Sequence, residues 1–317
     1  MQLAPFTAPA GYGYAEVRAE QLAALRSANA SVSTAIDVGD AMGPWGTYHP
    51  RNKRPVGERL AAAALRLRYG RADGPAWRHP IASGGADATP AGSGALVARV
   101  AFDAATLQGG GLVLNASANP CPRDDLQGYP PYPYYSLICA GFAAVVGAPA
   151  GAPALPTVYT RLDNTLLING AALPSGVFTV PQAAARCDAL AAQGLGCVGF
   201  EVISGPAPRD NTTTAAFSFH TLVDLRADAN ATAWASLTPA GTVTIPATAA
   251  VAADGVSLII SADCGDLCAS GRAELKAVTY AWGAWPVATL FAASGLPALP
   301  FYVTFNGTGT GAAVRHF

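Results

Sequence analysis

One short segment of the chain brings together residue types that could perform acid–base chemistry. Asp37 and Asp40 follow an apolar run, and His49 lies in the next loop, just ahead of a helical pattern. Open α/β sheets bind ligands at the carboxyl ends of their strands, and a histidine held near a carboxylate can act as a general base. The alternative is a loop histidine that only caps the helix or stacks on Trp45. The residue types alone leave both interpretations open.

The elements around this segment are predicted to alternate between strand and helix. Apolar or β-branched runs predict strands at 2–6 and 33–38, and apolar spacing predicts helices at 14–25 and 55–69. The order strand–helix–strand–helix indicates a parallel sheet covered by helices, which is an α/β arrangement. Two such units are too few for a doubly wound domain, so residues 1–74 are expected to be the end of a larger one.

Each predicted helix should turn one apolar side toward the core. The spacing of apolar residues selects Val17, Leu22 and Leu25 in the first helix, and Val56, Leu60, Ala64 and Leu67 in the second.

From about residue 75 the pattern changes to short β-branched runs separated by Gly, Pro and Asp. Regularly spaced short strands with turn signals predict a β-rich, sandwich-like or open-barrel domain over 75–317. The clearest predicted strands are 95–102, 111–114, 242–245, 256–260 and 276–282.

One stretch within this domain has a helical pattern, from 179 to 193. Cys187 and Cys197 flank its end, and Val198-Gly-Phe200 follows as a predicted strand. A cysteine on a short helix before Cys-x-Gly-Phe resembles the PAN/apple modules of extracellular proteins. The resemblance implies an insertion at about 155–225.

Composition excludes several classes of protein. The chain has 19 basic and 20 acidic residues, a formal net charge of -1, and therefore offers no electrostatic basis for binding nucleic acid or an anionic membrane. Its longest uncharged stretch, 277–314, is interrupted by prolines and glycines, so no membrane span is predicted.

Sequons and cysteines indicate the secretory pathway. Five asparagines begin Asn-x-Ser/Thr, where chance predicts about one, and the chain has 6 cysteines. The sequons begin at Asn29, Asn115, Asn211, Asn230 and Asn306. An extracellular or lysosomal glycoprotein is expected, although no signal peptide is visible at Met1, and we therefore expect preceding sequence. Cys264 and Cys268 are predicted to form a local disulfide rather than a metal site.

Two separate blocks carry a resemblance to a known family. The first is Tyr48-His-Pro-Arg-Asn-Lys53 with Val56-Gly-Glu-Arg-Leu60, after Asp37-Val-Gly-Asp40. The second is Ala277-Val-Thr-Tyr-Ala-Trp-Gly-Ala-Trp-Pro286, followed by Gly295-Leu-Pro-Ala-Leu-Pro-Phe301. Both resemble, in the same order, segments of the sialate O-acetylesterase family, whose catalytic domain ends in an Ile-Asp-x-Gly-Asp strand, a His-Pro segment and a Val-Gly-x-Arg-Leu helix.

The resemblance implies an SGNH-type, flavodoxin-like serine esterase segment, incomplete here, and hydrolysis of acetyl esters on sialic acids or other acetylated sugars without a cofactor. The family's general base corresponds to His49, and either Asp37 or Asp40 would orient it. The family's nucleophile motif does not occur; Ser93 and Ser257 are poor candidates, and the nucleophile is expected upstream of Met1.

The competing hypothesis is a non-catalytic, glycosylated extracellular module that binds carbohydrate or protein. His79, His220 and His316 have no spacing typical of a metal site. Trp282 and Trp285 are predicted to be core aromatics of the β-rich domain, with sugar stacking as the less favoured role.

Overall fold

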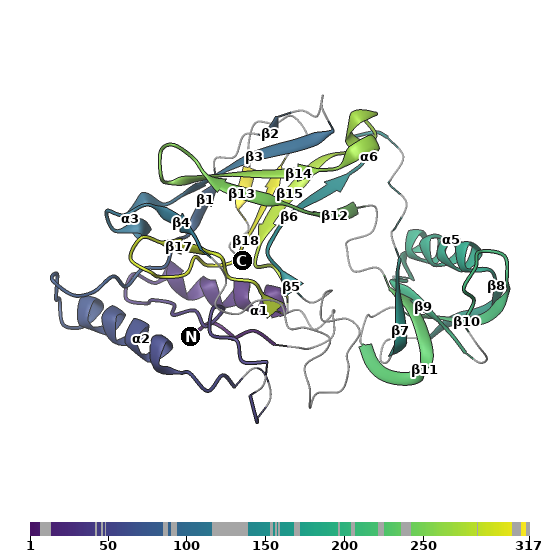
Figure 1. Ribbon diagram of the computed structural model, residues 1–317, viewed down its shortest axis with the longest axis horizontal. Helices are drawn as coiled ribbons and strands as arrows, with labels where there is room; N and C mark the ends of the chain where they lie inside the picture. Colours follow the sequence, from purple (N-terminus) through teal and green to yellow (C-terminus); the bar gives the residue numbers. More distant parts are fainter. Residues whose placement is uncertain are drawn as a thin grey trace.

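The chain is a mixed protein with more strand than helix (Figure 1). The computed structural model describes residues 1–6, 14–41, 43–45, 47, 49–84, 88–89, 94–115, 139–152, 155, 157, 159–167, 172–195, 197–203, 207–220, 225–235, 242–283, 285–305 and 312–314. Within these residues the coarse prediction of a mixed helix-and-sheet protein that is rich in strands is confirmed, and the described strands form several small sheets but no barrel.

Both predicted N-terminal helices are present. α1 (Tyr14–Gln21) continues as a 3-10 turn, η1 (Leu22–Arg26), and α2 (Arg54–Leu67) begins with a proline in its first turn. The chain leaves α2 through Gly70, whose φ of +64° lies in the left-handed region that suits glycine after a helix.

The two strands predicted in this part are wrong. Residues 2–6 and 33–38 are extended and lie close together, and the backbone N–H of Gln2 donates to the Ser33 carbonyl at 2.8 Å. No regular strand is assigned in the described part of 1–74. Arginine side chains occupy backbone carbonyls here: Arg18 donates to Leu3 and Ala4, and Arg59 donates to Thr34. These carbonyls therefore have side-chain donors as partners, and the predicted parallel sheet is not observed in these residues.

The same two arginines explain why the predicted helix faces are partly wrong. Arg18 is 0% exposed and Arg59 is 9% exposed, whereas Val17 and Leu60 are 44% and 43% exposed. The buried residues of α1 and α2 are Ala15, Arg18 and Ala19, and Val56, Arg59, Ala62 and Ala63, respectively. Each helix turns an arginine inward because that arginine bonds backbone that would otherwise be buried without a partner.

The first sheet of the β-rich part has the order β1-β3-β14-β13, with β2 also paired to β3, and all its pairs are antiparallel. Its strands are β1 (Ala82–Gly84), β2 (Ala88–Thr89), β3 (Ala95–Phe102), β13 (Thr248–Val251) and β14 (Ser257–Asp263).

The second sheet has the order β12-β6-β15-β18-β19 and is also antiparallel. Its strands are β6 (Phe142–Gly147), β12 (Thr242–Pro246), β15 (Glu274–Tyr280), β18 (Phe301–Phe305) and β19 (Ala312–Val314). The five strands predicted most clearly from the sequence are all found, at β3, β4 (Leu112–Leu114), β12, β14 and β15.

The two sheets share one hydrophobic core. Val100 and Ile260 of the first sheet and Val146, Val278 and Phe301 of the second belong to one buried cluster. Short elements complete this part: the β4–β17 pair, the parallel β5–β16 pair, and two helices. Their bounds are β5 (Cys139–Ala140), β16 (Trp285–Pro286), β17 (Leu290–Ala292), α3 (Ala104–Leu107) and α6 (Gly265–Ala269).

A third sheet, of order β7-β11-β9-β10-β8, forms a separate unit with α5 (Val180–Leu190), on the right of Figure 1. Its own core joins Cys187 of α5 to Phe200 and Phe217 of the sheet. The strands are β7 (Thr160–Leu167), β8 (Ala172–Phe178), β9 (Gly199–Val202), β10 (Ala215–His220) and β11 (Leu225–Ala235). The strands of the unit run from the start of β7 to the end of β11, and the insertion expected at about 155–225 stays a prediction.

Disulfides stabilise both β-rich parts. Cys187 pairs with Cys197 beside α5, and Cys264 pairs with Cys268 around α6, which confirms the predicted local bridge. Cys139 is also disulfide-bonded. No helix in the described ranges is both long and apolar enough to cross a membrane.

Candidate functional site

His49 lies exposed on the loop between the extended segment 33–38 and α2. The Asp40 carboxylate closes this loop: one oxygen accepts the Arg51 backbone N–H at 3.1 Å and its Nε at 2.7 Å, and the other accepts Nη2 at 3.0 Å. The Asp40 side chain is only 14% exposed. Its bidentate pair with Arg51 therefore fixes the backbone two residues after His49.

Asp37 makes a different pair, in the interior. Both of its oxygens accept from the Arg59 guanidinium, and the two side chains are only 11% and 9% exposed. Arg59 also donates to the Thr34 carbonyl at 2.8 Å. The pair therefore ties α2 to the extended segment.

Besides Arg59, the titratable groups on which the charge of Asp37 acts lie after residue 74 rather than in the His49 loop. Its charge acts on His79 and on Tyr280, whose hydroxyl accepts from the backbone N–H groups of Thr289 and Leu290. Burial raises the pKa of Tyr280 to about 12. Of the two carboxylates left open by the sequence, Asp40 is the one that shares a hydrogen-bonded loop with His49.

The structure gives no support to either serine that the sequence analysis considered as a nucleophile. Ser93 lies outside the described residues. Ser257 begins β14, is 3% exposed, and donates its Oγ proton to Asp254 at 2.8 Å within the β13–β14 turn. That hydrogen bond also contributes most to holding the pKa of Asp254 down, to about 2. A hydroxyl committed to a turn carboxylate is a structural group.

The third sheet contains a serine–histidine–glutamate cluster that the sequence analysis missed. His220 Nε2 lies 3.2 Å from Glu201 Oε1 and 3.2 Å from Ser218 Oγ. Ser218 and His220 are two residues apart on β10 and therefore lie on the same face of the sheet, and Glu201 lies on the adjacent β9. The period-2 spacing of Ser218 and His220 is the sequence signal that could have linked these two residues. In a catalytic triad the acid and the serine meet opposite ring nitrogens; here they meet the same one, so the cluster does not have triad geometry.

His316 lies outside the described residues, and no group of three or more His, Cys, Asp and Glu suited to a metal ion occurs in the part of the chain that the structure describes. His79 is buried.

The two tryptophans of the second sequence block have different surroundings. Trp285 is 1% exposed, which confirms it as a core residue, and it packs on Gly39 between the two aspartates. Trp282 is half-buried and meets the Tyr302 ring edge-on at a centroid distance of 5.3 Å. The two blocks that carry the family resemblance thus touch in space, although they lie near opposite ends of the chain.

Neither a scan against protein-family models nor a search of curated proteins found a match to this chain.

Proposed function

We propose that this chain carries the histidine-bearing end of a sialate O-acetylesterase-like hydrolase, which removes acetyl groups from the hydroxyls of sialic acids or other acetylated sugars. The observation that supports it best is the His49 loop: an exposed histidine ahead of α2, with an arginine-bound carboxylate closing its loop. The Gly39–Trp285 contact, which joins the two blocks that resemble the family, adds to it.

In this proposal His49 is the general base. It takes the proton of a serine hydroxyl as the serine oxygen attacks the acetyl carbonyl, and it gives that proton to the departing sugar oxygen. Water then enters and loses a proton to His49 as its oxygen attacks the acetyl carbonyl. The bond to the serine oxygen breaks, His49 returns the proton to that oxygen, and acetic acid and free serine result. Asp40 is the proposed positioning residue, because it fixes the loop, and Asp37 is assigned a structural role. The serine and the oxyanion donors belong to the SGNH-type, flavodoxin-like portion for which this chain shows no motif.

An extracellular or lysosomal location is part of the proposal. The disulfides of the described residues need an oxidising compartment, and three of the sequon asparagines, Asn29, Asn115 and Asn211, are exposed.

A second candidate function is a non-catalytic carbohydrate- or protein-binding module. The third sheet favours it, because this unit has its own core and disulfide and resembles PAN/apple modules in its Cys-helix-Cys-x-Gly-Phe pattern.

The test is acetate release from an O-acetylated sialic acid. The 317-residue chain is assayed alone and after co-expression with the N-terminal half of a family member that carries the serine motif. Turnover by the combined protein, with none from either part alone, supports the esterase. A stable complex of the two parts without turnover would leave the binding module as the better account.

A further inference from the structure

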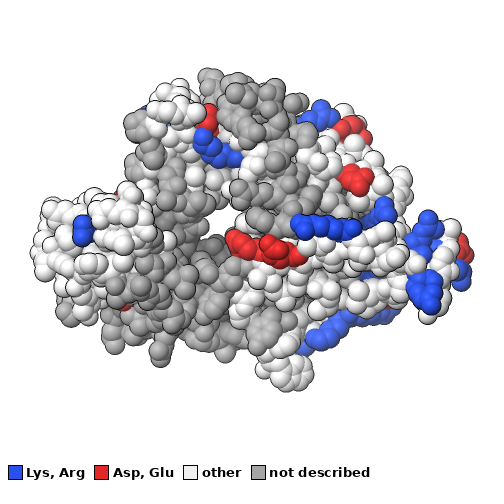
Figure 2. All heavy atoms as spheres, turned by 180° about the vertical axis from the view of Figure 1, so that it is seen from behind, with Lys and Arg blue, Asp and Glu red and all other residues white. Residues whose placement is uncertain are grey.

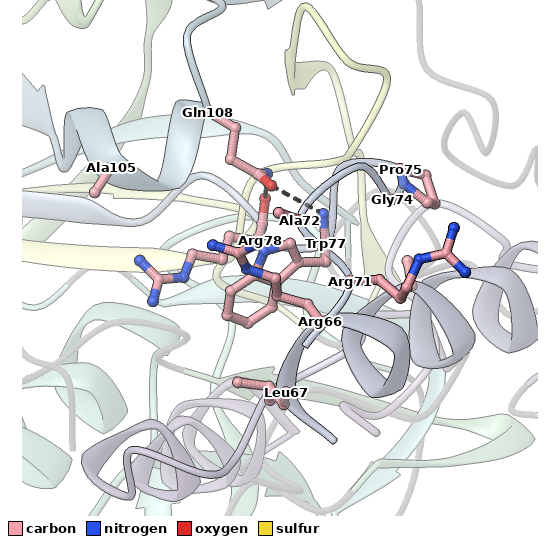
Figure 3. A pocket seen from close by; sticks show the side chains of 11 residues that line it. Arg66, Leu67, Arg71, Ala72, Gly74, Pro75, Trp77, Arg78, Ala105 and Gln108 are labelled. Carbon is pink, nitrogen blue, oxygen red and sulfur yellow. Dashed lines mark hydrogen bonds between the residues drawn. The ribbon is translucent and has the colours of Figure 1, made fainter. Parts of the chain in front are cut away.

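An open cavity of ≈ 460 Å³ lies at the end of α2 that is remote from His49 (Figure 3). It is lined by α2, by the loop that follows it, and by α3 with the next residue. The 14-residue helix separates it from the His49 loop by roughly 20 Å at 1.5 Å per residue. The cavity also lies where the helical part meets the β-rich part, a usual place for ligand sites.

Three arginines line the cavity, and two of them have no acidic partner in the described ranges. Arg71 is paired with Asp73 at 2.9 Å, and its guanidinium lies apart from the other two in Figure 3. Arg66 and Arg78 are exposed and form no ion pair with any residue that the structure describes. In Figure 2 basic side chains gather at the end of the molecule that carries α2, whereas few charged side chains are visible among the described residues at the end with the third sheet.

Trp77 provides an aromatic surface between these arginines. The Arg78 guanidinium lies 4.6 Å from the centroid of the indole ring, and the ring is half-buried. Gln108 fixes the backbone beneath it: its Oε1 accepts the Trp77 N–H at 3.2 Å, and its Nε2 donates to the Arg78 carbonyl at 3.2 Å. These two hydrogen bonds fix the backbone of the loop that carries Trp77 and Arg78.

Trp77 and Arg78 also line a second, smaller cavity of ≈ 180 Å³, and His79 is among its other lining residues. His79 is 3% exposed, and its Nδ1 lies 2.8 Å from the Pro297 carbonyl, so Nδ1 carries the proton and donates it. Nε2 is then an acceptor, and it has no hydrogen-bond partner in the described structure. Burial lowers the pKa of His79 to about 4, so the ring stays neutral at physiological pH.

The two cavities share Trp77 and Arg78, but their other lining residues differ in chemistry. Each cavity therefore favours a different chemical group of one ligand. Unpaired guanidinium groups favour a carboxylate, which they can bind through two parallel hydrogen bonds. Two residues that line the smaller cavity carry acceptors: His79, whose Nε2 has no partner among the described residues, and Asp103, whose carboxylate also accepts the Ala105 N–H. Acceptors of this kind favour hydroxyl donors. The indole between them can stack on a sugar ring.

We propose that the Arg66–Trp77–Arg78–His79 surface binds a sugar that bears a carboxylate, with the carboxylate on the arginines and ring hydroxyls toward His79. A bare anion would not use the indole or the buried acceptor, and a neutral sugar would leave the arginines unused. The proposal concerns binding alone and does not depend on the esterase hypothesis.

The experiment titrates the 317-residue chain with glucuronate, glucose and inorganic phosphate by calorimetry, with ligand-detected NMR for weak binding. Glucuronate is expected to bind more tightly than the other two, and its affinity should fall as salt is added. Arg66→Gln with Arg78→Gln should weaken glucuronate about tenfold or more, the equivalent of losing one charge-assisted hydrogen bond. Arg68→Gln is the matched control, because Arg68 is exposed at the same end of α2 but does not line the cavity, and it should leave the affinity unchanged.

The role of His79 is tested without a substitution in the core. Glucuronate should shift the Nε2 resonance of the wild-type imidazole, and glucose should shift it less. Failure of glucuronate to bind, equal affinity for phosphate, or unchanged affinity in the double arginine variant would each overturn the proposal.

Discussion

The indole of Trp285 lies directly on the backbone of Gly39. A Cβ placed on Gly39 would stand 2.9 Å from one ring carbon of Trp285 and 3.0 Å from the next, and 2.9 Å from a ring carbon of Pro5. Real Cβ atoms essentially never show such distances, so position 39 requires glycine unless Trp285 or Pro5 moves. The contact holds the turn that carries both carboxylates against the C-terminal block.

Gly39→Ala should therefore destabilise the fold by about 1–3 kcal/mol, the cost of overpacking a filled core. Gly57→Ala is the control, because its Cβ would meet nothing within 4 Å on the outside of α2 and should be neutral or stabilising. Chemical denaturation of both variants compares the two. Equal stability of Gly39→Ala and the wild type would mean that Trp285 can move away.

Arg59 and Asp37 should behave as a coupled buried pair. Arg59→Met leaves the Asp37 carboxylate buried without its partner, and we expect a loss of about 3–5 kcal/mol in the free energy of unfolding. Adding Asp37→Asn to Arg59→Met should recover part of that loss, which a double-mutant cycle measures. Strictly additive effects would show that the two side chains are not coupled. Arg54→Met is the control, since Arg54 pairs with Glu58 at the surface.

His79 should make stability depend on pH. Its pKa is about 4 in the folded protein against 6.5 for a free histidine, because burial disfavours the charged ring. The unfolded chain then binds the extra proton first, so stability is complete above about pH 6.5 and falls as the pH drops toward 4, by up to about 3 kcal/mol. An NMR titration of the His79 ring gives the folded pKa directly. A midpoint near 6.5 would contradict the buried, neutral histidine.

Passage through the secretory pathway should glycosylate exposed sequons and oxidise the cysteines. Expressed behind an added signal sequence in a eukaryotic host, the chain should carry glycans on Asn29, Asn115 and Asn211, which are exposed, and should have no free thiols. Peptide mass spectrometry with and without glycosidase and reductant measures both. Unmodified asparagines together with six titratable thiols would contradict the secretory location.

The sequence predicted the β-rich part better than the N-terminal part, and the reason is visible in particular residues. Short β-branched runs such as that of β3 bury alternate side chains, so their period is a direct signal of the sheet. In α1 and α2 the inward positions of Arg18 and Arg59 break the apolar period, because these arginines bond to backbone carbonyls of distant segments. Hydropathy cannot signal such a partner.

The candidate site shows the same division. Spacing selected His49, Asp37 and Asp40, but it could not say which carboxylate belongs to the loop, since that depends on Arg51 and Arg59 as partners. The cavity beside Trp77 gave no sequence signal, because its lining comes from three segments that meet only in the fold.

The role of His49 as the general base of an acetyl esterase is tested most directly by kcat for acetyl-ester hydrolysis by the combined protein described above. His49→Ala should lower kcat about 10³-fold or more, as removal of a triad base does, with the fold intact because the side chain is exposed. Asp40→Asn should lower kcat more than Asp37→Asn does once both variants are shown to be folded. An unchanged kcat for His49→Ala would contradict the account.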